Sequence, residues 1–353
     1  MKNLMRLLAM LTVLTLVAAA CGGSTADSTA TEDDADETTE TTDDDADDTG
    51  DDGDDGDAEE VDATQGSDLT FHMITHSDDG PFWSVVNRGM DAACSDLGVT
   101  CVWVPGNNDA NVMVQGIEGA IGEGTDGIAA SLPDPAALVP ALQGAVDGGV
   151  PVVTLNSGAN DYQEIGALTH VGQTEFIAGQ AAGDRFNAEG VTHVLCGQQE
   201  QNNVGLTERC GGLEDTFDGT VTTGFMDLDA DTSAQQAAIN AALAADDSID
   251  GFLGVGPVIT LSGLRAADDL GRDMTIGGFD LTPELLGEIE GGNILFTVDQ
   301  QQYLQGYLPI LQMYLFQTNS NTIGGGLPIL TGPGFVTADN AADVLSLSEA
   351  GTR

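Results

Sequence analysis

Basic residues are nearly missing from this sequence of 353 residues, which has 8 lysines and arginines, 58 aspartates and glutamates, and a formal net charge of −50. Beyond residue 67 the chain has no lysine, and its basic residues are Arg88, Arg185, Arg209, Arg265, Arg272 and Arg353. A surface with so few cations repels phosphate groups, which argues against nucleic acids and anionic lipid head groups as partners. Proteins that stay soluble at high salt have such acidic surfaces, so the sequence also indicates a salt-adapted host.

Long apolar runs and the signatures of common enzymes are missing as well. After the amino terminus, no segment approaches the roughly 20 apolar residues that cross a bilayer. The sequence lacks a Gly-x-Ser-x-Gly nucleophile elbow, a phosphate-binding glycine loop followed by Lys, and a His-Glu-x-x-His zinc motif. The histidines are scattered at strand positions: His72, His76, His170 and His193. The sequence therefore predicts a protein that is not an enzyme and that holds no metal or other cofactor.

The amino terminus has the pattern of an export signal. Two basic residues precede an apolar run from Leu7 to Val17, and three alanines then lead to Cys21. Because this run is too short to span a bilayer, residues 1–20 are predicted to be a signal peptide. The Ala-Ala-Ala-Cys sequence resembles the lipobox of bacterial lipoproteins, although their leucine three residues before the cysteine is absent. The resemblance implies lipid on Cys21 and anchoring at the outer face of the cytoplasmic membrane. Ordinary secretion, with cleavage elsewhere, is the alternative.

Residues 21–66 are almost entirely Asp, Glu, Thr, Ser, Ala and Gly. Such a segment cannot bury enough apolar surface to offset the conformational entropy that ordering would cost, so it is predicted to be a disordered acidic stalk. A calcium site is the sharper alternative, but the spacing of the acidic residues never matches a calcium-binding loop. The composition leaves room for weak, diffuse cation binding.

After the stalk, short apolar runs alternate regularly with amphipathic segments, and this series occurs twice. The alternation predicts an α/β fold with two doubly wound parallel-sheet lobes joined by a hinge. Because the carboxyl ends of parallel strands form the binding crevice of such lobes, the ligand is expected between them. The predicted bounds are 67–171 with 301–326 for the first lobe, 172–300 with 327–345 for the second, and 346–353 for a tail.

The cysteines other than Cys21 lie in two local groups. Cys94 and Cys101 flank the junction of a predicted helix and strand, and Cys196 and Cys210 flank the junction of a predicted strand and helix. Disulfides form in an exported protein, so the pairs Cys94–Cys101 and Cys196–Cys210 are favoured. Buried free thiols are the alternative.

Four short motifs resemble the type I periplasmic sugar-binding proteins of ABC transporters, in the cluster of ribose- and galactose-binding proteins. They are Gly80-Pro81-Phe82-Trp83, Asp126-Gly127-Ile128, Gly149-Val150-Pro151-Val152-Val153 and Gly277-Gly278-Phe279-Asp280, and their order and spacing carry the resemblance. It implies a monomeric solute-binding protein that closes on a monosaccharide or cyclic polyol and delivers it to an ABC permease. A sensor that presents its loaded form to a membrane receptor is the alternative role.

Three residues are candidate ligand contacts on both chemical grounds and resemblance. Phe82 and Trp83 follow a predicted strand, where exposed aromatic rings suit the C–H faces of a sugar; for Trp83, packing on the first helix is the alternative. The resemblance implies that Arg209 donates to ligand hydroxyls, and its fork of donors can grip two neighbouring oxygens. An ion pair with Glu208 or Glu214 is the alternative for Arg209.

The resemblance also implies that Asp280 accepts from ligand hydroxyls and that Gln300 lies at the hinge, with helix capping as the alternative for Asp280. Two positions depart from the ribose-binding pattern, Asn156-Ser157 and Gly256-Pro257, so the polar half of the pocket differs and ribose itself is not implied. Asn156 can both donate and accept hydrogen bonds from the first lobe. Further candidates of lower rank are His76, Asp78, Asp79, Asp134, Gln173 and Gly256.

Anchoring can be tested by replacing Cys21. We expect the Cys21→Ser variant to leave the membrane fraction, because a chain without the lipidated cysteine has no acyl group to bury in the bilayer. Immunoblotting of membrane and soluble fractions measures the change, and unaltered wild-type protein is the control. Retention of the variant in the membrane fraction at the wild-type level would contradict lipidation at Cys21.

Overall fold

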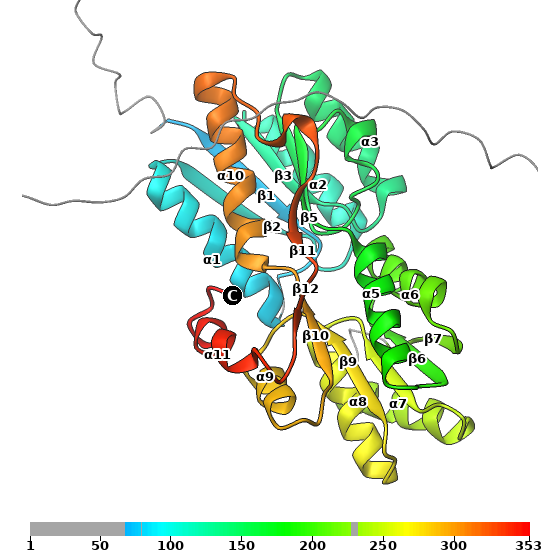
Figure 1. Ribbon diagram of the computed structural model, residues 1–353. Helices are drawn as coiled ribbons and strands as arrows, with labels where there is room; N and C mark the ends of the chain where they lie inside the picture. The colour runs from blue at the N-terminus through cyan, green and yellow to red at the C-terminus, as the bar shows by residue number, and fades with distance from the viewer. Residues whose placement is uncertain (1–67, 79, 227–231) are drawn as a thin grey trace, which may run out of the picture. The chain divides into compact units, whose positions relative to one another are not determined.

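The computed structural model describes residues 68–78, 80–226 and 232–353 (Figure 1). The predicted signal peptide, Cys21 and the stalk lie outside this range. Among the described residues, no helix has the length and apolar character needed to cross a membrane.

Two six-stranded sheets form the cores of two lobes, as the repeated series of strands and helices predicts. The first sheet is parallel and has the order β11-β5-β4-β3-β1-β2. Its strands are β1 (Thr70–Thr75), β2 (Thr100–Pro105), β3 (Gly127–Ser131), β4 (Val152–Leu155), β5 (Thr169–Gln173) and β11 (Ile329–Gly332).

The second sheet has the matching order β12-β10-β9-β8-β6-β7. Its strands are β6 (His193–Gln198), β7 (Thr220–Phe225), β8 (Gly251–Gly254), β9 (Thr275–Phe279), β10 (Phe296–Asp299) and β12 (Gly334–Val336). Strand β12 runs antiparallel to β10, and the other neighbours are parallel. The predicted fold class is therefore confirmed.

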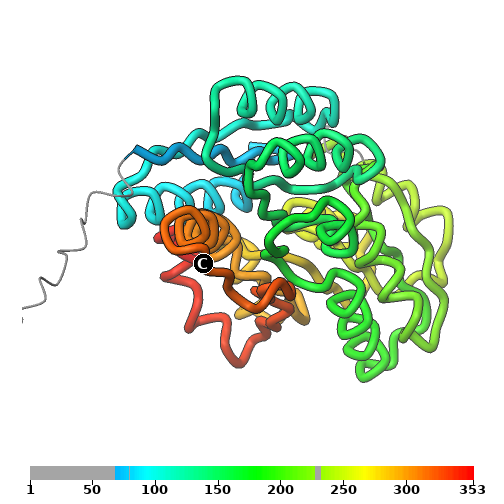
Figure 2. The backbone as a smooth tube through the Cα atoms, turned by 90° about the horizontal axis from the view of Figure 1, so that it is seen from above, coloured from blue at the N-terminus to red at the C-terminus, as the bar shows by residue number. Residues whose placement is uncertain are grey.

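Helices cover both faces of the first sheet, because its central strands are apolar on both sides. Phe71 and Met73 pack with α1 (Gly80–Leu97) and α10 (Gln302–Asn319) on one face. Ile74 packs on the other face with α2 (Ala110–Gly122) and α3 (Pro135–Asp147). Figures 1 and 2 show α1 and α10 side by side. The short helices α4 (Tyr162–Ile165) and η1 (Gly324–Gly326) complete this part of the chain.

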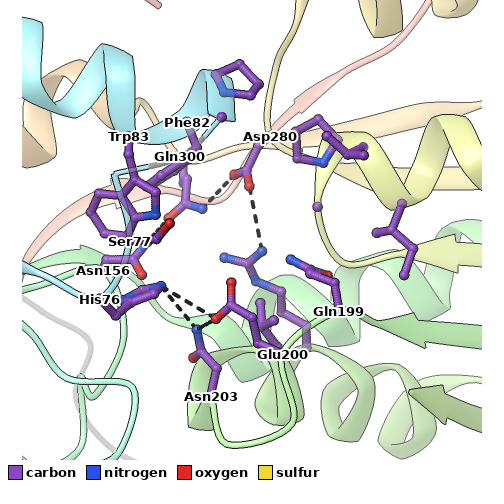
Figure 3. Close-up of a pocket in the computed structure, with 18 of the residues that line it drawn as sticks. His76, Ser77, Phe82, Trp83, Asn156, Gln199, Glu200, Asn203, Asp280 and Gln300 are labelled. Carbon is purple, nitrogen blue, oxygen red and sulfur yellow. Dashed lines mark hydrogen bonds and ion pairs between the residues drawn. The ribbon is translucent and has the colours of Figure 1, made fainter. Parts of the chain in front are cut away.

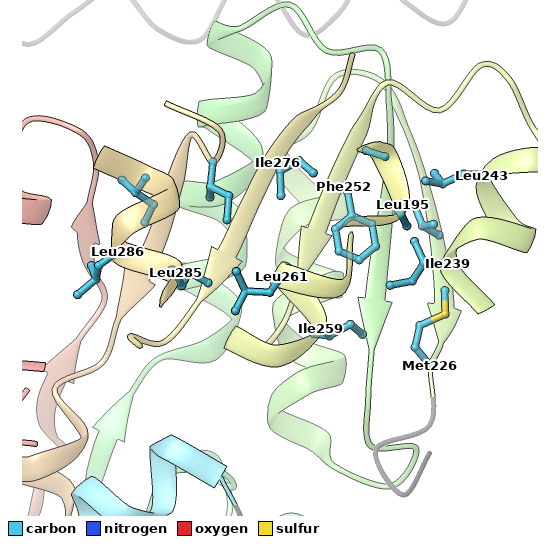
Figure 4. Close-up of a cluster of buried hydrophobic side chains, with 14 of the residues drawn as sticks. Leu195, Met226, Ile239, Leu243, Phe252, Ile259, Leu261, Ile276, Leu285 and Leu286 are labelled. Atoms are coloured by element: carbon cyan, nitrogen blue, oxygen red, sulfur yellow. The ribbon is translucent and has the colours of Figure 1, made fainter. Parts of the chain in front are cut away.

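The second lobe repeats this arrangement of layers. One face of its sheet packs with α5 (Glu175–Ala188) and α6 (Val204–Thr216). The other packs with α7 (Thr232–Ala245), α8 (Pro257–Leu270), α9 (Pro283–Glu290) and α11 (Ala341–Ala350), as the buried cluster around Phe252 and Ile276 shows (Figure 4). The two layers therefore cover both faces of the second sheet.

Close glycine contacts join one pair of helices in each lobe. A Cβ atom on Gly306 of α10 would lie 1.9 Å from the carbonyl oxygen of Val86 in α1. Likewise, a Cβ atom on Gly212 of α6 would lie 2.0 Å from the carbonyl oxygen of Phe176 in α5. These glycines let the backbones of paired helices approach more closely than any side chain permits.

Both predicted disulfides are present in the structure. Cys94 in α1 bonds to Cys101 in β2, with the Cα atoms 6.1 Å apart. Cys196 in β6 bonds to Cys210 in α6, with the Cα atoms 5.9 Å apart. Each bond joins a helix to a neighbouring strand. Because all four cysteines are bonded, the alternative of buried free thiols is wrong.

Two predicted boundaries near the carboxyl end differ from the structure. Residues 327–345 were expected in the second lobe, but β11 pairs with β5 in the first sheet while β12 pairs with β10 in the second. The two short strands follow each other closely, so the sequence does not show that they belong to different sheets. Pro333 lies between them, and it has no backbone N–H to donate to a sheet. Residues 346–353 are not a free tail, because α11 extends to Ala350 and Arg353 Nε lies 2.6 Å from Asp299 Oδ2.

The α5–α6 contact can be tested with one added methyl group. We expect Gly212→Ala to lower the free energy of unfolding by about 1–3 kcal/mol, because the new Cβ must push the α5 backbone away. Gly119→Ala in α2 is the matched control: its Cβ meets no atom within 4 Å, so alanine should stabilise the helix by about 0.5–1 kcal/mol. Urea denaturation measures both, and equal effects would contradict the packing argument.

Candidate functional site

A cavity of about 150 Å³ lies where the strand ends of the two lobes face each other (Figure 3). The first lobe contributes the segment from the end of β1 to the start of α1 and the residue after β4. The second lobe contributes the segments that follow β6, β8 and β9. The structure brings together these predicted residues at the cavity: His76, Phe82, Trp83, Asn156, Arg209, Gly256, Asp280 and Gln300.

Three lower-ranked candidates, Asp78, Asp134 and Gln173, do not line this cavity in the structure. Asp78 is exposed, and Asp79 lies outside the described residues. The carboxylate of Asp134 accepts from the Ala137 amide as the cap of α3, and the residue lines a neighbouring cavity. Gln173 is fully buried, and its amide donates to the Glu175 carboxylate at 2.8 Å.

Trp83 has both of the roles considered for it, since it packs in the core and also lines the cavity. The ring of Trp83 is 5 % exposed and packs within the first lobe's core, yet it also lines the cavity. Its neighbours Phe82 and His76 meet it edge to face, with ring centroids 5.0 Å and 4.7 Å away. The core therefore fixes the orientation of an aromatic surface that a ligand can contact.

Arg209 is buried and held by a carboxylate that the sequence analysis missed. Its Nε and Nη2 atoms donate to Glu175 at 2.6 Å and 3.0 Å, and Nη1 donates to the carbonyl oxygen of Val255 at 2.7 Å. The predicted alternative of a pair with Glu208 or Glu214 is wrong, because the first turn of α5 brings Glu175 against α6. Burial lowers the pKa of Arg209, but the carboxylates of Glu175 and Asp280 outweigh this effect and raise it.

Asp280 places a carboxylate opposite this arginine. Its Oδ1 atom accepts from Gln300 Nε2 at 2.6 Å, and its Oδ2 atom lies 3.8 Å from Arg209 Nη1. Burial raises the pKa of Asp280 to about 6, although Arg209 and Gln300 both act to lower it. Thr282 caps α9 instead, so the capping alternative for Asp280 is wrong.

The segment after β6 supplies three lining residues that the sequence analysis did not select: Gln199, Glu200 and Asn203. A run of amide and carboxylate side chains directly after a predicted strand was the available signal. Gln199 Oε1 is buried and has no hydrogen-bond partner among the described residues, which leaves an acceptor free at the cavity. Gly256 makes room for this side chain, because a Cβ there would lie 2.8 Å from Gln199 Nε2.

Direct contacts join the two lobes beside the cavity. Ser157 Oγ donates to Asn203 Oδ1 at 2.9 Å, and the Val204 amide donates to the Pro133 carbonyl at 3.0 Å. His76 Nε2 lies 3.6 Å from Glu200 Oε2, across the same boundary (Figure 3). These contacts hold the lobes together beside the cavity, which residues of both lobes line.

Comparison with known proteins supports the predicted relationship. Residues 71–319 match the family described as periplasmic binding protein domain. A carbohydrate transporter structure from Acidothermus cellulolyticus 11B, in complex with myo-inositol, is 40% identical, covers 81% of this chain and 99% of its own, and has a TM-score of 0.78.

Two curated relatives are more distant. The xylose/arabinose-binding protein of Sulfolobus acidocaldarius is 29% identical over 78% of this chain and 72% of its own length. The ribose import binding protein of Bacillus subtilis is 23% identical over 65% of this chain and 75% of its own length. Both relatives are named as sugar-binding proteins, and the matched family is one of binding proteins, which confirms the expectation that the chain is not an enzyme.

The raised pKa of Asp280 predicts a pH dependence of stability. Because the folded pKa of about 6 exceeds the unfolded value, the folded state binds the proton more tightly, and stability falls as pH rises from about 4 to 7. We therefore expect the free energy of unfolding of Asp280→Asn, relative to that of the wild type, to increase by about 1–3 kcal/mol as the pH rises from 4 to 7. Urea denaturation of the ligand-free proteins measures this. A difference that is equal at both pH values would contradict it.

Proposed function

Since this chain belongs to the periplasmic binding protein domain family, we propose that it captures a small polyol outside the cytoplasmic membrane and delivers it to an ABC permease. The ligand is a cyclic polyol such as myo-inositol or a monosaccharide. The relative that is 40% identical and has myo-inositol bound supports the first of these choices.

The facing atoms of Arg209 and Asp280 are the observation that carries this proposal. Nη1 of Arg209 and Oδ2 of Asp280 lie 3.8 Å apart, too far for a mutual hydrogen bond. One hydroxyl oxygen placed about 2.8 Å from each atom accepts from the arginine and donates to the carboxylate. Hydroxyl groups both donate and accept, so this spacing suits a polyol better than a carbonyl or an amide.

The rest of the cavity fits a single ring. Its volume of about 150 Å³ lies below the range of about 300–1,000 Å³ typical of drug-sized ligands, which favours one sugar or cyclitol ring. Trp83 offers an apolar surface to the C–H face of such a ring, while Gln199 and Asn156 offer amide groups to its rim.

Closure of the lobes couples binding to delivery. The ligand contacts Asn156 from the first lobe and Arg209 and Asp280 from the second, so it stabilises the closed arrangement more than an open one. Gln300 lies between β10 and α10, where the chain passes from the second lobe to the first. Its Oε1 accepts from Gln305 Nε2 at 2.8 Å, and its Nε2 donates to Asp280. A permease then distinguishes the loaded protein by its closed shape. The signal peptide directs export, and a lipid on Cys21 keeps the mature protein at the membrane, near that permease.

A ligand screen tests this proposal. We expect myo-inositol or a pentose or hexose to raise the melting temperature of the full chain, because a ligand that binds only the folded state stabilises it. Thermal shift measurements over a panel of sugars, cyclitols, nucleosides and amino acids would identify it.

The Asp280→Asn variant should bind the ligand at least tenfold more weakly, because the neutral amide of asparagine accepts weaker hydrogen bonds than a charged carboxylate does. Asp91→Asn, at an exposed position of α1, is the matched control and should bind as the wild type does. Isothermal titration calorimetry measures both affinities. A shift with nucleosides or amino acids alone, or equal affinities of the two variants, would contradict a polyol held by Asp280.

A further inference from the structure

Arg209, which alone among the described arginines lines the cavity, is already neutralised by the protein. Arg209 and Glu175 are 3 % and 1 % exposed, and two parallel hydrogen bonds join them at 2.6 Å and 3.0 Å. A buried, two-bonded pair of this kind acts as a fixed unit with no net charge. The positive charge of Arg209 is therefore not available to balance an anionic ligand.

Two further carboxylates face the same space. The cation nearest to Asp280 is this same Arg209, at 3.8 Å, so one arginine faces both Asp280 and Glu175. Glu200 Oε2 accepts from Asn203 Nδ2 at 2.6 Å and lies 3.6 Å from His76 Nε2. Within the described residues, Glu200 forms no ion pair with an arginine.

His76 does not cancel the charge of Glu200 at neutral pH. Burial lowers the pKa of His76, the Glu200 carboxylate offsets this only in part, and Arg209 lowers the pKa further. The imidazole is therefore neutral, and the cavity holds two carboxylates, Asp280 and Glu200, beyond the balanced Arg209–Glu175 pair.

We propose that the cavity selects its polyol by charge, admitting neutral and amine-bearing sugars or cyclitols and rejecting those with a carboxylate or phosphate, and that Glu200 sets this preference. The inference rests on the proposed function, because it concerns the same cavity. An ammonium group gains charge-assisted hydrogen bonds to carboxylates, whereas an anion is repelled by them in a medium of low dielectric constant. Glu200 is named as the determinant because Asp280 accepts from Gln300 and faces Arg209 at 3.8 Å, whereas Glu200 pairs with no arginine among the described residues.

Two matched ligand series test this selection. One contains glucose, glucosamine and glucuronate, and the other contains myo-inositol, an inositol with one hydroxyl replaced by an amine, and inositol monophosphate. In calorimetric titrations of the full chain at pH 7, we expect the amine to bind at least as tightly as the neutral member and the anion at least a hundredfold more weakly. An anion that binds within tenfold of its neutral counterpart would overturn the inference.

The role of Glu200 is tested by Glu200→Gln, which keeps an acceptor for Asn203 and removes the charge. We expect the ratio of amine to neutral affinity to fall about tenfold, while neutral affinity changes less than threefold. Glu284→Gln, an exposed partner of Arg265, is the control and should leave every affinity unchanged. An unchanged ratio in Glu200→Gln would overturn the role of Glu200. Neutral binding without any preference by charge sinks this inference alone. The absence of binding by every sugar and cyclitol of the thermal shift panel sinks the proposed function with it.

Discussion

The buried ion pair of Arg209 and Glu175 organises the second lobe's half of the cavity. Glu175 lies in the first turn of α5 and Arg209 in α6, so the pair fixes how these helices meet. Arg209 also donates to the carbonyl of Val255 at the end of β8 and stands 4.5 Å from the centre of the Phe279 ring in β9. Removal of one partner would leave an uncompensated buried charge, at a cost of about 3–5 kcal/mol. The same contacts aim the remaining donors of Arg209 toward Asp280.

Around this pair, the described residues of the two lobes meet through polar contacts and share no apolar core. Each hydrophobic cluster belongs to one lobe or the other. Across the boundary, Asn203 of the second lobe forms hydrogen bonds with Ser157 and His76 of the first. Polar contacts exchange readily with water, so opening the lobes exposes little apolar surface. This division suits a protein that must be rigid within each lobe and must release its ligand between them.

Sequence reasoning predicted the architecture well, because strand and helix periodicity is local. The repeated series of apolar and amphipathic segments predicted both sheets, and neighbouring elements predicted both disulfides, Cys94–Cys101 and Cys196–Cys210. The boundary at residue 327 was misplaced, since β11 and β12 are close neighbours in the sequence that pair with different sheets. Their pairing partners lie far away in the sequence, so the break at Pro333 does not show which sheet each strand joins.

The sequence by itself determined the candidates for ligand contact: the aromatic rings of Phe82 and Trp83, the donors of Arg209 and the carboxylate of Asp280. Only the tertiary structure decided how these groups are used. It paired Arg209 with Glu175, 34 residues away, and it placed Glu200 and Gln199 at the cavity. The physical reason is that strand ends from two separate sheets converge there. Which side chains are neutralised, and which remain free for a ligand, depends on contacts across the fold and not along the chain.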